Sequence, residues 1–327
     1  MASSVSGPIS LPDSRYDLST YWGRVKHCAD ISDPSTLLTN SASLEKSKEL
    51  ISQYKNGQIK QMTPELWNAK KILDSTVHPD TGETVLLPFR MSSCVLSNLV
   101  VTGGMLTPGL GTFGTLFWQI ANQSLNVAIN ISNANKSHPL STSQLIQNYT
   151  IAVTASCGVA LGLNSIVPRL KNISASSKLI LGRLVPFAAV VSAGIVNVFA
   201  MRSEEIKKGI SVFDENGDEV GTSKTAAIYA VGETAASRVI NATPIMVIPP
   251  LLLVKLQQSV LKGKGLGIQT LANLGLITVT SFAVLPFALA IFPQYQGISV
   301  NRLEASLTGK KDKNGKEIDT VYFNRGI

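Results

Sequence analysis

Residues 179–201, LILGRLVPFAAVVSAGIVNVFAM, decide the fold of this chain. From 184 to 201 the stretch contains no Asp, Glu, Lys or Arg. A helix needs about 20 mostly apolar residues to cross the hydrocarbon core of a bilayer, and each charge placed there costs free energy. The stretch therefore predicts a membrane-spanning helix.

The same pattern recurs along much of the chain. Only 15% of the residues are charged, against roughly 25% in an ordinary soluble domain. Charge is also absent from 91–135, 137–168, 239–254 and 265–301. Long buried helices in a soluble protein would require a more charged surface. We predict an all-α polytopic membrane protein with transmembrane domain 91–292, whose five spans cover about 91–112, 144–167, 179–201, 235–255 and 267–292.

The two ends of the chain are polar and predict water-facing regions. Residues 1–90 predict a soluble helical cap, and 293–327 a C-terminal tail. Asn-Gly turns in 211–220 and 311–318 predict small β-hairpins outside the bilayer. The first resembles a calcium loop superficially but lacks the twelve-residue ligand pattern. Within the cap, helices are expected near 20–30, from Asp33-Pro34, over 43–56 and from Thr63 to about Asp74.

The composition argues against several classes of function. The net charge of +8 is spread over both ends and the short loops, without the aromatic-rich basic stripe of a nucleic-acid-binding protein. No phosphate-binding or catalytic motif is present. We therefore expect no enzyme, no catalytic residue, no metal and no cofactor. The candidates for such chemistry are isolated in the sequence: His27, His78 and His138, and Cys28, Cys94 and Cys157.

The loop charges suggest a topology. Loops 169–178 and 255–264 together hold six basic residues and no acid, and the positive-inside rule places such loops on the inner side of a membrane. With five crossings, the N-terminal cap would lie on that same side and the C-terminus on the other. Residues 1–14 lack the features of a secretory signal or a cleaved transit peptide.

Segment 113–135 is free of charge but carries a polar stripe. Its carboxamides follow helical spacings of three and four, and its opposite face is apolar. Such a helix could lie at the interface, re-enter the membrane or span it. Carboxamides can hold a polar solute by hydrogen bonds without fixed charge, and equally can join helices. The stripe comprises Gln119, Asn122, Asn126, Asn130 and Asn133.

Other polar residues within the spans admit the same two interpretations. Asn98, Asn197 and Asn273 each occupy a different span, and Glu233 and Arg238 mark the start of the fourth. Ionisable groups at membrane depth usually mark a functional site, although the long side chains of groups near a helix end can reach the membrane–water interface. Glycines in the first span, among them Gly103 and Gly104, and the pair Gly158 and Gly162 predict close helix packing.

Several motifs together resemble one protein family. They include His78-Pro79-Asp80-Thr81-Gly82-Glu83, Asn122-Gln123-Ser124-Leu125-Asn126, Asn133-Ala134-Asn135-Lys136, Pro186-Phe187-Ala188-Ala189, Asn241-Ala242-Thr243-Pro244 and Phe323-Asn324-Arg325-Gly326. In this order and over essentially the whole length, the chain resembles sideroflexins, and specifically a fungal member. The resemblance implies a five-span protein of the mitochondrial inner membrane without a cleaved presequence. It also implies amino-acid transport, with serine entry for one-carbon metabolism as the favoured role.

The residues and the resemblance lead to one hypothesis and one rival. The hypothesis is a secondary transporter whose solute contacts Asn122, Gln123, Asn126 and Asn130, with the lipid bilayer as its other partner. His78, Asp80 and Glu83 would gate its mouth or, as the favoured alternative, fix a turn. The rival is a non-transporting scaffold or assembly factor. A different amino acid or a carboxylate as substrate, and a homo-oligomer, are compatible with the same sequence.

Overall fold

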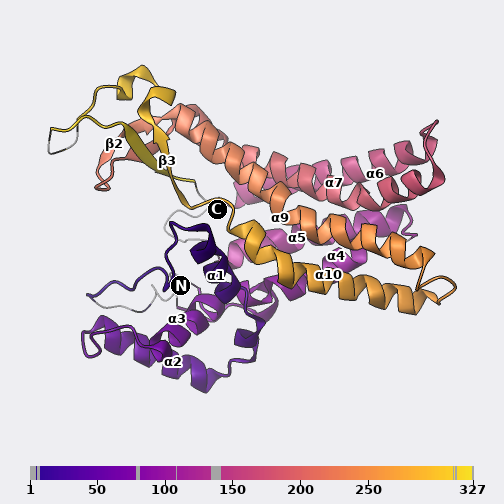
Figure 1. Cartoon of the computed structure of the whole chain (residues 1–327), viewed down its shortest axis with the longest axis horizontal. Coiled ribbons are helices and arrows are strands. Elements are labelled where there is room, and N and C mark those ends of the chain that lie inside the picture. The colour runs from indigo at the N-terminus through magenta and orange to yellow at the C-terminus, as the bar shows by residue number, and fades with distance from the viewer. Residues whose placement is uncertain are drawn as a thin grey trace.

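The computed structural model describes residues 5, 8–78, 82–107, 109–133, 141–311, 313 and 315–325, apart from the side chains of Met91, Cys94, Asn130 and Asn133. Long helices lie roughly side by side in a bundle, with a helical cap and a small sheet at one end (Figure 1). The cap contains α1 (Tyr21–Ile31), α2 (Ser41–Lys55) and α3 (Pro64–Thr76). The bundle contains α4 (Cys94–Met105), α5 (Thr112–Asn133), α6 (Thr142–Ile166), α7 (Ala175–Met201), α9 (Lys224–Gln258) and α10 (Leu266–Leu289).

The remaining elements are short. Helix α8 (Ser203–Lys208) follows α7, and the strands are β1 (Ile210–Phe213), β2 (Glu219–Ser223), β3 (Tyr295–Ser299) and β4 (Thr320–Asn324). Turns of 3-10 helix occur at Pro34–Leu38, Leu87–Phe89, Met91–Ser93, Val167–Arg169, Val300–Arg302 and Ala305–Leu307.

Four of the described helices are long and apolar enough to cross a membrane: α6 with its continuation to Arg169, α7, α9 and α10. The predicted fold class, an all-α polytopic membrane protein with small strands, is confirmed. The first predicted span, 91–112, differs. Its helix, α4, has 12 residues, about 18 Å at 1.5 Å per residue and short of the roughly 30 Å hydrocarbon core. It ends at Met105 because Thr107 precedes a proline, which disfavours helical backbone, and Gly109 has a φ of 75°.

Helix α5 contains most of segment 113–135, whose placement the sequence left open. It packs between α4 and α6, and its carboxamides point inward: Gln119 is 1% exposed and Asn122 4%. Its apolar side faces outward, with Phe113 83% and Phe117 53% exposed. A water-soluble helix shows the opposite arrangement. Gln119 and Asn122 therefore face the interior of the bundle.

The α4–α5 hairpin changes the predicted topology. Because α5 returns the chain to the end from which α4 started, the cap and the C-terminal sheet lie at the same end of the bundle (Figure 1). Arg24 Nε donates to Ala290 O at the C-terminal end of α10 (2.8 Å), and Tyr21 OH donates to Phe287 O (3.2 Å). The expectation that the cap shares a side with the basic loops, opposite the C-terminus, is wrong.

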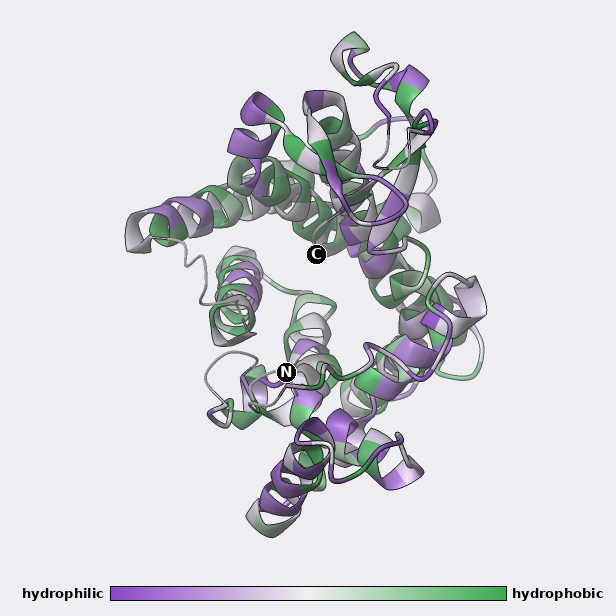
Figure 2. Cartoon of the chain, turned by 90° about the vertical axis from the view of Figure 1, so that its left-hand side faces the viewer, coloured by the Kyte–Doolittle hydropathy of each residue, from purple (hydrophilic) through white to green (hydrophobic). Residues whose placement is uncertain are grey.

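The cap and the sheet are the polar part of the molecule. Figure 2 views their end and shows hydrophilic colour on them and hydrophobic colour along the bundle helices. The cap closes on its own apolar core, which includes Leu44, Ile51, Leu66 and Leu73. Its helices begin where the sequence predicts, since Asn40 and Thr63 cap α2 and α3 with side-chain acceptors.

The sheet is antiparallel, with strand order β2-β1-β4-β3. The predicted hairpin at 211–220 is confirmed as β1 and β2. Of the hairpin predicted at 311–318, the described residues show a bridge between Lys311 and Glu317. Strands β3 and β4 were not predicted from sequence. Their buried residues Val321 and Phe323 pack with Ala226 and Ala230 of α9, so the sheet rests on the beginning of that helix.

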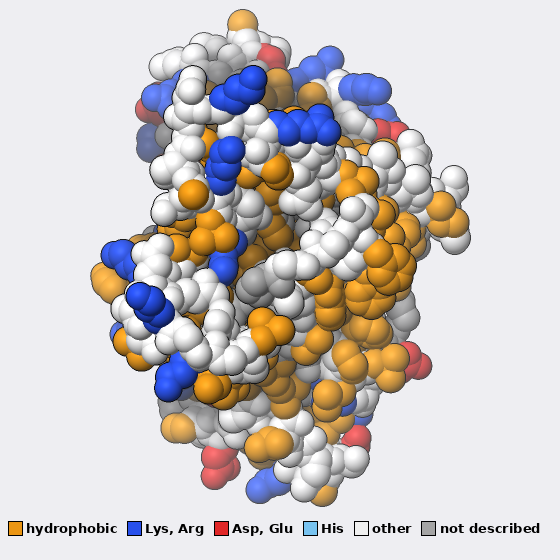
Figure 3. Space-filling model, turned by 90° about the vertical axis from the view of Figure 1, so that its right-hand side faces the viewer, with side chains coloured by type: hydrophobic (Ala, Val, Ile, Leu, Met, Phe, Trp, Pro, Cys, Tyr) orange, Lys and Arg blue, Asp and Glu red, His pale blue; other side chains and the backbone are white. Residues whose placement is uncertain are grey.

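The opposite end of the bundle is basic. It carries the loops between α6 and α7 and between α9 and α10, with Arg169, Lys171, Lys178, Lys255, Lys262 and Lys264. Figure 3 views this end and shows Lys and Arg side chains over it, with acidic side chains only at its edges. Residues 1–90 contain ten basic and ten acidic residues, so the cap adds no net charge at the other end.

Close helix packing through glycine is found in the first pair of glycines and not in the second. A Cβ placed on Gly104 would lie 2.2 Å from Trp118 Cε2, and one on Gly103 would lie 2.6 Å from Leu274 Cδ2. At Gly158 and Gly162 an added Cβ would meet nothing within 4 Å. Within the described chain, Gly158 and Gly162 therefore meet no neighbouring helix, because spacing alone does not tell which helix face meets a neighbour.

Candidate functional site

A cavity of about 540 Å³ opens among the bundle helices near the basic end. Its walls come from the α4–α5 connection, α5, the end of α6, the first half of α7, α9 and α10. Ligand pockets in proteins commonly have volumes of about 300–1,000 Å³, so its size suits a small solute. The polar residues that line it are Thr107, Thr115, Gln119, Asn164, Lys178, Arg183 and Asn273. Among the described residues, no acid lines it.

Two cations among the described residues line this cavity, Lys178 and Arg183, and Arg183 lies the deeper of the two, about two turns into α7. Its Nη2 donates to Gln257 Oε1 of α9 (2.7 Å), and Gln257 Nε2 donates to Gln269 Oε1 of α10 (2.6 Å). The described residues give Arg183 no carboxylate partner within 4.0 Å. A guanidinium held in this way can bind a carboxylate through two hydrogen bonds.

Two buried carboxamides supply neutral groups on the cavity wall. Gln119 Oε1 accepts from Ser156 Oγ of α6 (2.6 Å), which fixes the side chain and leaves its amide nitrogen as a donor. Asn273 is 2% exposed, and its Oδ1 has no hydrogen-bond partner among the described residues. A buried oxygen without a partner costs free energy, and a solute donor would relieve that cost.

The structure places the predicted stripe beside this cavity and only partly in it. Asn122 and Gln123 are buried, and Asn122 Nδ2 has no partner among the described residues. Asn126 is half-buried. Of the stripe, Gln119 lines the cavity; the side chain of Asn130 lies outside the described residues. Asn122, Gln123, Asn126 and Asn130 stay candidates for solute contact at a neighbouring position along α5.

The other predicted residues are dispersed. Asn98 and Asn197 are half-buried on α4 and α7 and are absent from the cavity lining. In the cap, His78 N donates to Glu83 O (2.9 Å) and Gly82 N donates to His78 O (3.1 Å). These backbone bonds favour the turn-fixing role of the motif over the gate. Asp80 lies outside the described residues.

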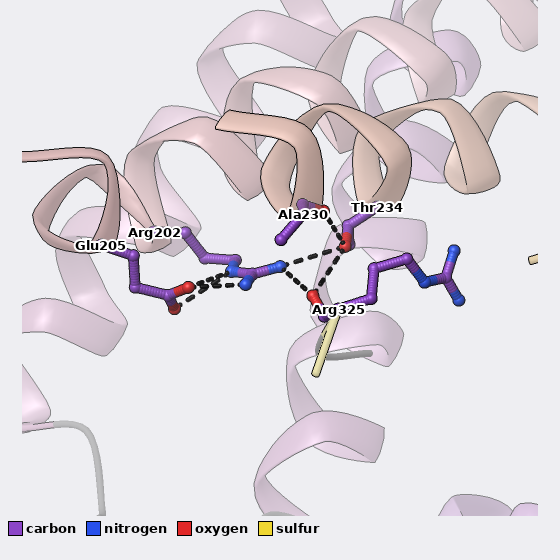
Figure 4. Close-up of polar contacts among 5 residues, drawn as sticks. All are labelled: Arg202, Glu205, Ala230, Thr234 and Arg325. Carbon is purple, nitrogen blue, oxygen red and sulfur yellow. Dashed lines mark hydrogen bonds and ion pairs between the residues drawn. The ribbon is translucent and has the colours of Figure 1, made fainter. Parts of the chain in front are cut away.

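A second polar cluster lies at the cap end of the bundle, where the C-terminal segment meets α7 and α9. Arg202 donates to the carboxylate of Glu205 (2.5–3.0 Å), to Thr234 Oγ1 (3.0 Å) and to Arg325 O (2.6 Å). Thr234 Oγ1 in turn donates to Ala230 O (2.8 Å). Figure 4 shows this network and shows the guanidinium of Arg325 directed away from Arg202. The network joins β4 to the bundle.

Glu233, a predicted site residue, belongs to this cluster. Its Oε1 accepts from Gln296 Nε2 of β3 (2.8 Å), and the charges of Glu233 and Arg325 act on each other. Arg238 lies on α9 with its Cβ near Gly194 of α7. Burial lowers the pKa of the Arg325 guanidinium, and the neighbouring Glu233 opposes that effect.

Three further residues were not predicted as site residues from the sequence: Arg183, Lys178 and Arg325. Arg183 sits inside a predicted span, and an arginine at membrane depth is a signal that could have identified it. Arg325 carried no such signal, because its burial depends on strands β3 and β4. Within the described ranges, no group of His, Cys, Asp or Glu could hold a metal ion.

Residues 10–327 match the family model described as Sideroflexins. The chain is 76% identical to Sideroflexin FSF1 of Saccharomyces cerevisiae over 327 residues, all of both chains. It is 57% identical to Sideroflexin fsf1 of Schizosaccharomyces pombe, covering 97% of this chain and 98% of the relative. Identity to human Sideroflexin-1 is 37%, over 98% of each. No solved structure is significantly similar.

Proposed function

The chain belongs to the sideroflexin family, and we propose that it carries a small polar amino acid across a membrane. The observation that supports this most is the cavity of about 540 Å³ within a bundle of membrane-type helices. Its polar wall combines two cations, Arg183 and Lys178, with carboxamides and hydroxyls and, among the described residues, no acid. Such a wall suits a solute that has a carboxylate and further hydrogen-bonding groups.

The finer part of the proposal is serine as substrate and the mitochondrial inner membrane as location. Serine has a carboxylate for Arg183, an ammonium group for the unpartnered Asn273 Oδ1, and a hydroxyl that can donate to or accept from Gln119 or Asn164. The location and the link to one-carbon metabolism are supported by the family resemblance of the sequence. The all-basic loop end suits the inner side of an energised membrane.

The cavity opens near the basic end, while the Arg202 network ties the chain together at the cap end. A carrier that alternates its access would have one end open and the other closed in each state. The described structure would then be the state in which solute enters from the basic end.

The deciding experiment is uptake of labelled L-serine by purified protein in liposomes. We expect saturable uptake, and we expect Arg183→Gln to abolish it. Lys262→Gln is the matched control, since it removes one positive charge from an exposed loop at the same end without touching the cavity lining. Background uptake by folded wild-type protein, judged by its melting transition, would favour the scaffold or assembly factor. Uptake of another amino acid or a carboxylate in place of serine would correct the substrate alone.

A further inference from the structure

The cluster at the cap end contains four buried atoms whose hydrogen-bonding capacity is unused within the described residues. Two are donors, Nε and Nη1 of Arg325. Two are acceptors, Oε2 of Glu233 and Oε1 of Gln296. Native proteins rarely leave buried polar atoms unpaired, and here four such atoms occur together.

These atoms belong to one neighbourhood. Gln296 Nε2 donates to Glu233 Oε1 (2.8 Å), and Arg325 N donates to Gln294 O (2.9 Å), two residues before Gln296. The chain carbonyl of Arg325 is tied to Thr234, which follows Glu233 on α9. The cluster therefore brings together α9, β3 and the end of β4.

The charged groups are held apart. Glu233 and Arg325 act on each other electrostatically, yet no ion pair forms between them within 4.0 Å. Arg325 is 9% exposed, and its guanidinium lies over the Phe292 ring, 5.1 Å from the centroid. Other groups satisfy Arg202, so it does not compensate Glu233. A half-buried carboxylate and a buried guanidinium that do not pair with each other lose part of their hydration without a compensating ion pair, which costs free energy.

A zwitterion complements this arrangement. The α-carboxylate of an amino acid supplies two acceptor oxygens for the donors of Arg325, and its α-ammonium group supplies donors for Glu233 Oε2 and Gln296 Oε1. Acids without an amino group would satisfy Arg325 alone, and amines without a carboxylate would satisfy Glu233 alone. We propose that Glu233, Gln296 and Arg325 form a second binding site, at the cap end of the bundle, for a zwitterionic α-amino acid.

This inference deepens the proposed function and rests on it for the identity of the solute. The cavity at the basic end and the second site at the cap end lie at opposite ends of the bundle, as two successive binding sites on one transport pathway would. The second site selects α-amino acids over plain carboxylates, a distinction that Arg183 alone does not make.

Equilibrium binding to detergent-purified protein tests the site without requiring transport. Unlabelled L-serine, N-acetyl-L-serine, which lacks the ammonium charge, and ethanolamine, which lacks the carboxylate, compete against labelled L-serine. We expect each analogue to compete at least about tenfold more weakly than L-serine, the effect of losing one charged hydrogen-bonding group. Equal competition by N-acetyl-L-serine, or no binding of L-serine, would overturn the proposal.

Two variants test whether the cluster causes the preference for L-serine over the two analogues. In Glu233→Gln the preference for L-serine over N-acetyl-L-serine should shrink, and in Arg325→Gln the preference over ethanolamine should shrink. Glu219→Gln and Arg302→Gln are matched controls on exposed positions of the same end and should retain both preferences. Unchanged preferences in folded Glu233→Gln and Arg325→Gln would remove the second site and leave the carrier proposal standing.

A measurement on wild-type protein covers the case in which a variant does not fold. Hydrogen exchange of the peptides covering 294–299 and 320–325 should slow when L-serine is added, and N-acetyl-L-serine should not slow it. No change with saturating L-serine would overturn the site. Conversely, the protein could show the expected binding preferences and the slowed hydrogen exchange but no uptake in liposomes. That result would support the second site and refute transport.

Discussion

Replacing Gly104 by alanine should separate α4 from α5. The added Cβ would lie 2.2 Å from Trp118 Cε2, whereas ordinary contact begins at 3.4 Å, so the indole must move by about 1.2 Å. The ring has little room, because it packs edge-on against Phe117 at 5.1 Å and joins the core around Val101 and Met246. Overpacking of this kind costs about 1–3 kcal/mol. The Gly→Ala change itself favours helix by roughly 1 kcal/mol.

Gly158→Ala isolates the steric part of this effect. Gly158 is also helical, but an added Cβ there meets nothing within 4 Å, so the helix-propensity gain is shared and cancels. The two variants should differ by about 1–3 kcal/mol, or about 2–12 °C in melting temperature at about 2–4 °C per kcal/mol. Thermal unfolding of purified protein in one detergent measures this difference. If the melting temperature of Gly104→Ala equals or exceeds that of Gly158→Ala, the α4–α5 packing described here is wrong.

Three further predictions concern single side chains. Ser156→Ala should destabilise the protein by about 0.6–1.7 kcal/mol, the range for polar contacts between membrane helices, because Gln119 loses its partner; adding Gln119→Leu should recover part of the melting temperature. Asn126→Leu should abolish serine uptake without lowering the yield of folded protein, and retained uptake would remove Asn126 from the path. Burial of Glu304 opposes its ionisation, but hydrogen bonds from Ser223 and the first turn of α9 outweigh it and bring its pKa to about 2, from 4.5. Its stabilising contribution is therefore present above pH 4.5 and lost as pH falls through about 2, so Glu304→Gln should lower the melting temperature at pH 7, and that deficit should shrink between pH 4.5 and 2.

The long helices were predictable because one physical cause dominates them. Runs without charge, such as 184–201, identify lipid-compatible helices whatever their neighbours are. The end of α4 at Met105 was not predicted, since hydropathy continues through 112 while the backbone turns at Thr107. The predicted topology was wrong because hydropathy did not show that the chain reverses between α4 and α5. Helix α4 is too short to span, and the polar-striped α5 that follows gives no strong hydropathy signal.

The candidate site could be predicted from the sequence only in part. The spacing of Gln119 and Asn122 indicated one polar face, because side chains three or four residues apart share one side of a helix; that this face turns inward is known only from the structure. Arg325 and Gln296 could not be placed, since their burial depends on pairing between β3 and β4, which are separated by about twenty residues of loop. Long-range pairing of this kind leaves little periodic trace in either segment.

The placement of both basic loops at one end gives the molecule an asymmetric distribution of positive charge along the membrane normal. Moving one elementary charge across 100 mV costs about 2.3 kcal/mol, so inverting a protein with six such charges at one end would cost about 14 kcal/mol. In an energised membrane, the voltage itself would therefore lock the basic end toward the negative compartment and hold the cap in the positive one.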